Sequence, residues 1–159
     1  MNLQTALTVL FVAAGIVSYN PVSAQAAEGS AKGKTQYSAV RHDYVKKNGI
    51  PSPYKGMKNS VAANSKSLEE GANLYKTNCE LCHGAKGHGD GPGGKALDPR
   101  PANLASSVKM KTDTDAFLFW TVSEGGTQFG TGMPPFKDSL SADDRWKVIL
   151  YLRKKLAGM

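Results

Sequence analysis

The sequence predicts an all-α domain of three main helices joined by long loops, with little or no sheet. Helix-starting patterns occur at Ser67 and Ser141, where acidic residues follow within three positions and apolar residues then recur at helical spacing. A third, shorter helix starts at Thr112 or Asp113 and ends before two consecutive glycines. The 159 residues, 40% of them apolar, are enough for one modest core with appended segments.

The first helix carries Leu68, Gly71, Ala72 and Tyr75 at helical spacing. A glycine inside a helix costs about 1 kcal/mol relative to alanine. Gly71 therefore indicates that another helix crosses closely at this point, the alternative being an incidental glycine.

The last helix follows Ser141 and bears an apolar stripe of the kind that faces a core. Its last turn contains three basic residues, 153–155, which favour the C-terminal end of the helix dipole, and Gly158 is a suitable stop. The stripe consists of Trp146, Val148, Ile149, Leu150, Tyr151, Leu152 and Leu156.

Residues 79–83, Cys-Glu-Leu-Cys-His, carry the functional interpretation. Two thiols three positions apart, followed at once by an imidazole, form the haem c attachment signature. Each thiol can add to one vinyl group of the porphyrin, while His83 is placed under the iron as its proximal ligand. The chain has only two cysteines, Cys79 and Cys82, and both belong to this pattern.

Three other interpretations of the two cysteines remain open. A thioredoxin-like dithiol would need a strand–helix–strand pattern nearby, and none surrounds Cys79. A zinc site needs four ligands, and only His42, His83 and His88 remain as further histidines. A Cys79–Cys82 disulfide would close a very small, strained loop.

Six glycines between residues 84 and 94 predict a loop that bends round the edge of the haem. A phosphate-binding loop is the alternative, but the stretch lacks both a Gly-Lys-Ser/Thr ending and a preceding strand. His88 lies in this loop, five residues after His83, and is interpreted as a surface residue rather than a rival ligand.

Met133 is the candidate for the second axial ligand. Of the five methionines, Met1 lies in a predicted signal, Met57 in a basic arm and Met159 at the end of the chain, which leaves Met110 as the competitor. Glycines before Met133 permit an irregular approach, and two prolines after it stiffen the exit. A neutral thioether favours reduced iron, so His/Met ligation raises the reduction potential.

Together these patterns resemble class I monohaem cytochromes c. Residues 70–75, leading into the cysteine motif, and Gly-Met-Pro-Pro-Phe at 132–136 are similar to the small bacterial soluble type and to the haem c domains of respiratory complexes. The resemblance covers residues 67–159. It implies the class I cytochrome c fold, in which loops wrap around one covalent haem c, with His83 and Met133 as axial ligands.

Further residues are candidates for contacts with the haem or its ligand. By resemblance, Pro101 best matches a proline whose carbonyl accepts the Nδ1 hydrogen of the axial histidine, and Tyr151 matches an aromatic residue that packs on Gly71. Arg100 could pair with a haem propionate or be an ordinary exposed arginine. Trp120 could donate its indole N–H to a propionate or only pack in the core.

Residues 1–26 are predicted to be a secretory signal. A short apolar run from Leu3 to Val17 precedes small-x-Ala cleavage patterns at residues 22–26. The run is too short for a comfortable membrane span. If the signal is cleaved, we expect a periplasmic protein without an integral membrane span. The alternative is an uncleaved N-terminal anchor, because residues 1–27 lack the Lys or Arg of a usual signal.

Residues 27–66 form a basic arm ahead of the domain. They hold eight Lys or Arg against two acidic residues, so most of the net charge of +7 lies in this segment. The stretch 29–34 reads as a flexible linker, whereas the prolines and apolar residues from Ile50 to Val61 could lie irregularly against the domain. A solvated tether and a docking arm for an acidic redox partner are both open.

These observations predict a one-electron carrier of a respiratory chain rather than an enzyme, because two filled axial positions leave no place for a substrate. The basic residues are scattered and form no nucleic-acid recognition pattern, so nucleic acid is not expected as a partner. The positive net charge instead predicts a redox partner with an acidic docking surface, or an anionic membrane surface. The alternatives are an electron-transfer subunit of a larger oxidoreductase, and a haem peroxidase or gas-binding protein with a labile sixth ligand.

Overall fold

A computed structural model describes residues 36–159, and the described residues are helical without any strand. The all-α prediction is therefore confirmed. The predicted signal and the predicted linker at 29–34 lie outside the described residues. In chain order the elements are α1 (Gln36–Asn48), α2 (Ser65–Asn78), α3 (Glu80–His83), the 3₁₀ turn η1 (Pro92–Gly94), α4 (Leu104–Ser107), α5 (Asp115–Glu124), the 3₁₀ turn η2 (Thr127–Phe129), α6 (Ala142–Tyr151) and the π-helical turn η3 (Leu152–Leu156).

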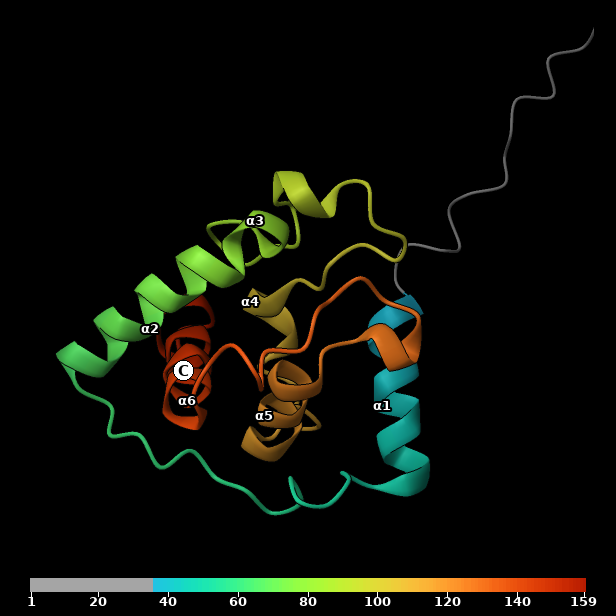
Figure 1. The fold of residues 1–159 in the computed structure, drawn as a ribbon, viewed down its shortest axis with the longest axis horizontal. Helices are drawn as coiled ribbons and strands as arrows, with labels where there is room; N and C mark the ends of the chain where they lie inside the picture. The colour runs from blue at the N-terminus through green and yellow to red at the C-terminus, as the bar shows by residue number, and fades with distance from the viewer. Residues whose placement is uncertain (1–35) are drawn as a thin grey trace, which may run out of the picture.

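Helices α2 and α6 cross closely, and Gly71 lies at the crossing (Figure 1). A Cβ atom on Gly71 would collide with the carbonyl oxygen of Lys147, and it would lie 2.9 Å from the carbonyl carbon of that residue and 3.1 Å from Cβ of Tyr151. The predicted crossing is confirmed. Tyr151 does approach Gly71, but the tightest contact is with the backbone of α6 one turn earlier.

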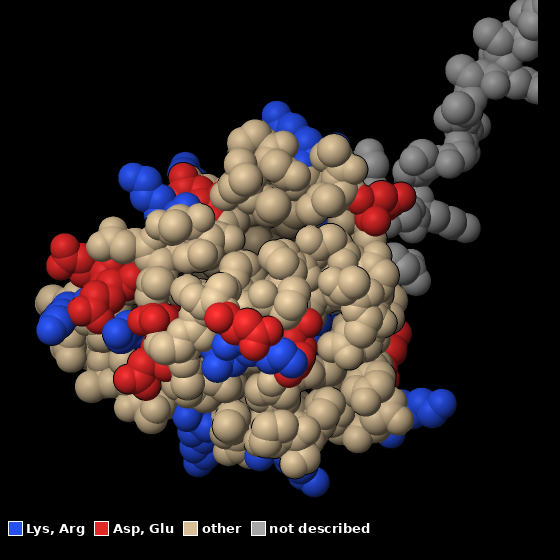
Figure 2. Space-filling model, viewed as in Figure 1, with Lys and Arg blue, Asp and Glu red and all other residues tan. Residues whose placement is uncertain are grey.

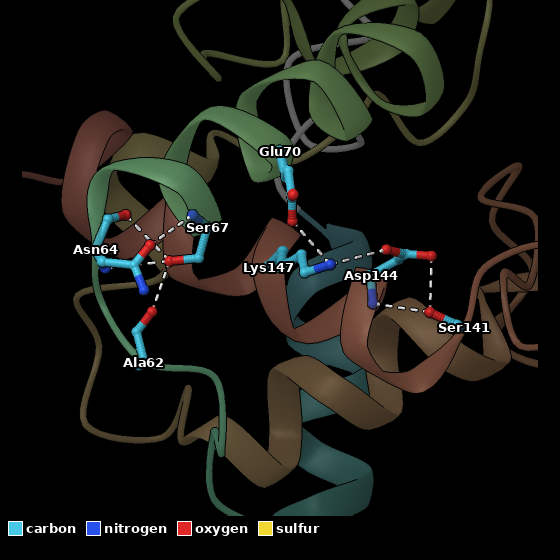
Figure 3. A network of polar contacts seen from close by, with 7 residues as sticks. All are labelled: Ala62, Asn64, Ser67, Glu70, Ser141, Asp144 and Lys147. Atoms are coloured by element: carbon cyan, nitrogen blue, oxygen red, sulfur yellow. Dashed lines mark hydrogen bonds and ion pairs between the residues drawn. The ribbon is translucent and has the colours of Figure 1, made fainter.

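The first turn of α2 is capped by Asn64 rather than by Ser67. The Asn64 side chain accepts a hydrogen bond from the Ser67 backbone N–H at 2.9 Å, and the Ser67 hydroxyl is paired with the Asn64 backbone N–H at 3.1 Å (Figure 3). The predicted start at Ser67 is thus wrong by one turn, because Ser67 is the reciprocal partner in a capping box that begins at Asn64.

The other two main helices begin near their predicted residues. Helix α5 is capped by Thr114, one or two residues later than predicted. Helix α6 is capped by Ser141, whose hydroxyl accepts the Asp144 backbone N–H at 3.1 Å, as the sequence indicates. Lys147 then pairs with Glu70 of α2 at 2.9 Å and with Asp144 at 3.5 Å, which places an ion-pair network beside the crossing (Figure 3).

The core lies where α5 meets α6. Helix α5 is buried on almost every side, and Phe119 stacks on Trp146 of α6 with ring centroids 4.0 Å apart. Tyr75 of α2, which is 1% exposed, adds a tilted contact with Tyr151 at 5.4 Å.

The basic arm is more ordered than the sequence predicts. Residues 36–48 form helix α1, which no sequence pattern predicted, and α1 lies beside η2 on the side of the molecule away from α2 (Figure 1). The following irregular segment packs on the core through Ile50, Tyr54 and Val61. The amide side chain of Asn59 donates to the Trp146 carbonyl at 3.0 Å. This part of the arm therefore lies against the domain and is not a solvated tether.

Candidate functional site

One large cavity lies between α3, α5, the loop from Leu97 to Leu104 and the loop from Gly126 to Phe136. Its empty volume is about 1220 Å³, including the part that opens to solvent, and Figure 2 shows the surface hollowed below the lobe that α3 and η1 form. Its walls are mostly apolar, with Phe117, Leu118 and Val122 of α5 among them. A cavity of this size and character suits a large, mostly apolar ligand.

The cysteine motif forms one tight helical turn in the cavity wall. Helix α2 ends at Asn78 and is capped by Cys79, whose backbone N–H still donates to the Tyr75 carbonyl at 2.8 Å. The Cys79 carbonyl then accepts from the backbone N–H groups of Cys82 at 3.2 Å and of His83 at 2.9 Å. Cys79, Cys82 and His83 all line the cavity, and both cysteines are free thiols, which excludes the disulfide interpretation for this structure.

The environment of Cys79 suppresses ionisation of its thiol. Burial raises the pKa of Cys79 to about 12, and the neighbouring Cys82 adds to the effect. A thiol in this state is a poor nucleophile for thiol–disulfide exchange at neutral pH, since the thiolate is the reactive form. Together with the absence of strands among residues 36–159, this argues against the thioredoxin-like alternative.

His83 is held in the tautomer that a metal ligand requires. Its Nδ1 lies 3.1 Å from the Ala102 carbonyl oxygen and is assigned as the N–H donor, which leaves the Nε2 lone pair available. Burial lowers the pKa of His83, partly offset by the hydrogen bond to Ala102. The His83 imidazole is therefore neutral. The acceptor is Ala102 rather than the predicted Pro101, so the assignment from the resemblance is wrong by one residue.

The glycine-rich loop after His83 fits tightly around this turn. A Cβ atom on Gly91 would lie 2.7 Å from the Cys82 carbonyl carbon. A Cβ atom on Gly94 would lie 2.6 Å from Cγ of Pro101 and 2.7 Å from the Cys82 carbonyl oxygen. The glycines therefore allow the backbone to approach α3 and hold the loop of Pro101 against it. His88 is exposed, as predicted.

Met133 lines the same cavity as His83, whereas Met110 does not and is 43% exposed. The segment around Met133 is fixed against the end of α5. The Met133 carbonyl accepts from the Gly126 backbone N–H at 2.8 Å, and a Cβ atom on Gly125 would lie 2.6 Å from the same oxygen. The geometry thus favours Met133 over Met110 as the thioether that reaches the cavity.

Two buried polar atoms have no hydrogen-bond partner among the described residues: Nη1 of Arg41 and Oγ1 of Thr121. Both side chains line the cavity. Buried donors are normally satisfied, so both indicate that the cavity takes a ligand with acceptor atoms. The cavity brings together two thiols, a neutral imidazole, a thioether and unpaired donors between apolar walls. These are the groups needed to hold an apolar porphyrin that carries carboxylate side chains. The residues present fit a haem.

The two other predicted haem contacts differ in position. Arg100 lines the cavity and is exposed. Trp120 is 3% exposed and does not line the cavity; it packs edge-on against Phe117 at 6.2 Å and against Phe129 at 5.8 Å. Its position corresponds to the core-packing alternative, because the indole faces α1 and η2 rather than the cavity.

No sequence pattern predicted Arg41 or Thr121 as residues of the site. None predicted the contact in the wall of the same cavity in which His42 Nε2, on a half-buried ring, lies 2.5 Å from Oδ1 of the buried Asp113. Arg41 and His42 lie in a segment that the sequence assigns to a basic arm, where nothing marks two residues among many as buried. An isolated Thr in a helix carries no signal of its own.

The all-α fold and the cysteine–histidine turn beside this cavity are those of a c-type cytochrome, a class that binds haem c. Residues 66–152 match the family described as cytochrome c oxidase, cbb3-type, subunit III, and the chain belongs to this family. A search of curated proteins gave no match.

Two solved structures align with this chain. A chain of the reducing HAO-like protein complex of Kuenenia stuttgartiensis aligns with a TM-score of 0.52 and 23% identity over 69% of this chain and 52% of that chain, so the present chain spans about half its length. Cytochrome cL from the marine methylotrophic bacterium Methylophaga aminisulfidivorans aligns with a TM-score of 0.43 and 20% identity over 72% of this chain and 66% of that chain. At such identity the first of these supports the fold alone, which agrees with the predicted class I cytochrome fold.

Proposed function

We propose that the protein is a one-electron carrier that holds a single haem c, covalently attached through Cys79 and Cys82, with His83 and Met133 as axial ligands. The observation that carries this proposal is that these four side chains line one apolar cavity. Bound there, the haem supplies reversible one-electron chemistry at its iron.

The chain's own residues have distinct tasks in this proposal. The Ala102 carbonyl fixes the His83 ring so that Nε2 faces the ligand. The side chains of α5 exclude water, and a low dielectric increases the influence of every nearby charge on the potential. With His83 and Met133 both engaged, the protein offers no open coordination position, so it moves electrons without binding a substrate.

We further propose a periplasmic location and a partner with an acidic docking surface. Support comes from the predicted signal and from the excess of Lys and Arg in residues 27–66. On the face shown in Figure 2, by contrast, basic and acidic residues are interspersed rather than separated by sign. No helix in residues 36–159 combines the length and the apolar character that a membrane span requires.

The second candidate is an electron-transfer subunit of a larger oxidoreductase, and the family supports it because its description is that of an oxidase subunit. Size-exclusion chromatography of a native extract, followed by haem absorbance, separates the two. Elution near the 16.9 kDa of the full chain, or below it once the predicted signal is removed, supports a free carrier. Co-elution with a larger complex supports the subunit role.

The central test is optical. We expect a pyridine haemochrome of the c type from the purified holoprotein, and a weak far-red sulfur-to-iron band in the oxidised state that is lost in Met133→Ala and kept in Met110→Ala. Absence of the haemochrome would refute covalent attachment. A high-spin spectrum that shifts readily with carbon monoxide or cyanide would favour the peroxidase or gas-binding alternative.

A further inference from the structure

Helix α1 precedes the residues that match the family, yet it contributes to the cavity wall. The family match begins at residue 66, whereas Arg41 and His42 of α1 both line the cavity. Figure 1 shows α1 standing against η2, the turn that precedes the Met133 loop. The basic arm therefore takes part in the construction of the haem site.

The guanidinium of Arg41 is buried without a full set of hydrogen-bond partners, which is unusual for a cation. Arg41 is 6% exposed, and its Cζ lies 4.4 Å from the centroid of Trp120 and 4.6 Å from that of Phe129. Nη2 donates to the Gly125 carbonyl, but Nη1 has no partner. Two aromatic rings and one carbonyl thus hold the guanidinium plane, and one N–H edge remains available.

No carboxylate among the described residues forms an ion pair with Arg41. Glu124 is the carboxylate whose charge acts on Arg41, but its oxygens accept hydrogen bonds from Lys137 at 2.9 Å and from the Tyr54 hydroxyl. Burial accordingly lowers the pKa of Arg41 to about 10, and the attraction of Glu124 offsets only part of this shift. A buried cation without a counter-ion is unfavourable, so an anion supplied by the ligand would remove an unfavourable contribution to the stability of the site.

Thr121 supplies a second donor in the same wall. It lies on α5 one turn before Gly125, whose backbone N–H donates to the Thr121 carbonyl at 3.0 Å. Its hydroxyl is buried and unpartnered. The other charged groups of the wall are otherwise accounted for: Asp113 is engaged by His42, and Arg100 is exposed to solvent.

We propose that Arg41 and Thr121 bind a haem propionate, so that helix α1 supplies the counter-ion of the cofactor from outside the family domain. This inference rests on the proposed function. It assigns to Arg41 the propionate-binding task that the sequence suggested for Arg100. A positive charge buried beside the haem favours the reduced state, so Arg41 also raises the reduction potential.

The test uses the holoprotein in four versions: wild type, Arg41→Met, Arg41→Lys and Arg100→Met. Methionine preserves much of the length and apolar packing but lacks the charge, and lysine restores the charge without the planar fork. Propionate hydrogen bonding is read from the propionate-bending band in resonance Raman spectra, and the midpoint potential is measured by spectroelectrochemistry.

We expect Arg41→Met to shift the propionate band and lower the midpoint potential, and Arg41→Lys to recover most of the potential. Arg100→Met should leave the propionate band in place and lower the potential less than Arg41→Met does, because Arg100 lines the cavity but is exposed to solvent. If Arg41 only fastens α1 to the Gly125 carbonyl, Arg41→Met leaves band and potential as in wild type and lowers only thermal stability. That result overturns the proposal. A shift of the propionate band in Arg100→Met but not in Arg41→Met overturns it as well.

A second pair of variants keeps the test decisive if Arg41→Met fails to mature. Thr121→Val removes the hydroxyl at nearly constant volume and should shift the propionate band, whereas Thr121→Ser should not. An unchanged band in Thr121→Val contradicts the role of Thr121. The haemochrome and far-red band of the wild type report separately on the proposed function, so failure of covalent attachment or of Met133 ligation is distinguishable from failure of this inference.

Discussion

The two helices that flank the centre of the molecule, α2 and α1, are held in different ways. Helix α2 crosses α6 through a small residue and an apolar face, whereas α1 contacts η2 and α5 through Arg41, His42 and Tyr44. The first contact is visible in the pattern of the sequence. The second depends on individually placed polar and aromatic side chains, and no periodic pattern predicts it.

The largest effect is expected at the α2–α6 crossing. Gly71→Ala should destabilise the holoprotein by about 2 kcal/mol or more, because the new Cβ would overlap the Lys147 carbonyl and force the helices apart. Helix propensity alone predicts the opposite sign, a gain of about 1 kcal/mol.

Chemical denaturation of the holoprotein, followed by far-UV circular dichroism, decides between the two signs. Asn73→Ala, at an exposed position of the same helix, is the matched control and should be neutral or slightly stabilising. A stabilised Gly71→Ala variant would mean that the crossing is looser than the structure shows.

The next effect belongs to the α1 side. His42→Ala should cost about 1–3 kcal/mol, because Asp113, 3% exposed, would keep a buried carboxylate without its imidazole partner. His42 also stacks on Phe117, with centroids 4.7 Å apart.

A double-mutant cycle with Asp113→Asn measures the coupling between the two side chains by denaturant unfolding. A coupling energy near zero would show that the contact between His42 and Asp113 does not hold α1 in place. Lys46→Ala, which removes an exposed residue from the same helix, should leave the free energy of unfolding nearly unchanged.

A smaller effect tests where α2 begins. Asn64→Ala should cost about 1 kcal/mol, as expected for loss of an N-cap, and Ser141→Ala should cost a similar amount at α6. Both values come from thermal or urea unfolding. If Asn64→Ala is neutral while Ser67→Ala is costly, the helix starts at Ser67 as the sequence suggested.

The smallest effect concerns the network beside the crossing. A hydrogen bond from Ser141, aided by Lys147, holds the pKa of Asp144 below its ordinary value of 3.8. A carboxyl with a lowered folded-state pKa stabilises the fold above its unfolded pKa and loses this contribution as pH falls through the folded value. Asp144→Asn should therefore be slightly destabilising at pH 7 and neutral once the pH has fallen below the lowered folded-state pKa of Asp144. Equal destabilisation at both pH values would exclude the charge as the cause.

The outcome at particular residues shows how far local pattern reaches. The cysteine–histidine turn, the preference for Met133 over Met110 and the crossing at Gly71 were all predicted, because each depends on spacing or on residue type within one short segment. Ligation itself remains a prediction for these residues. The histidine's carbonyl partner was assigned to Pro101 instead of Ala102, because a loop of variable length does not fix which carbonyl faces a distant ring.

The sequence by itself determined the helical class, the cysteine–histidine motif of c-type cytochromes and the helix crossing, since these follow from residue spacing, capping and periodicity. The tertiary structure alone decided that residues 36–48 form a helix against η2, that Trp120 faces this helix, and that Arg41 and Thr121 present unpaired donors to the cavity. Burial of a polar side chain depends on everything packed around it, and that surrounding is assembled from segments far apart in the chain.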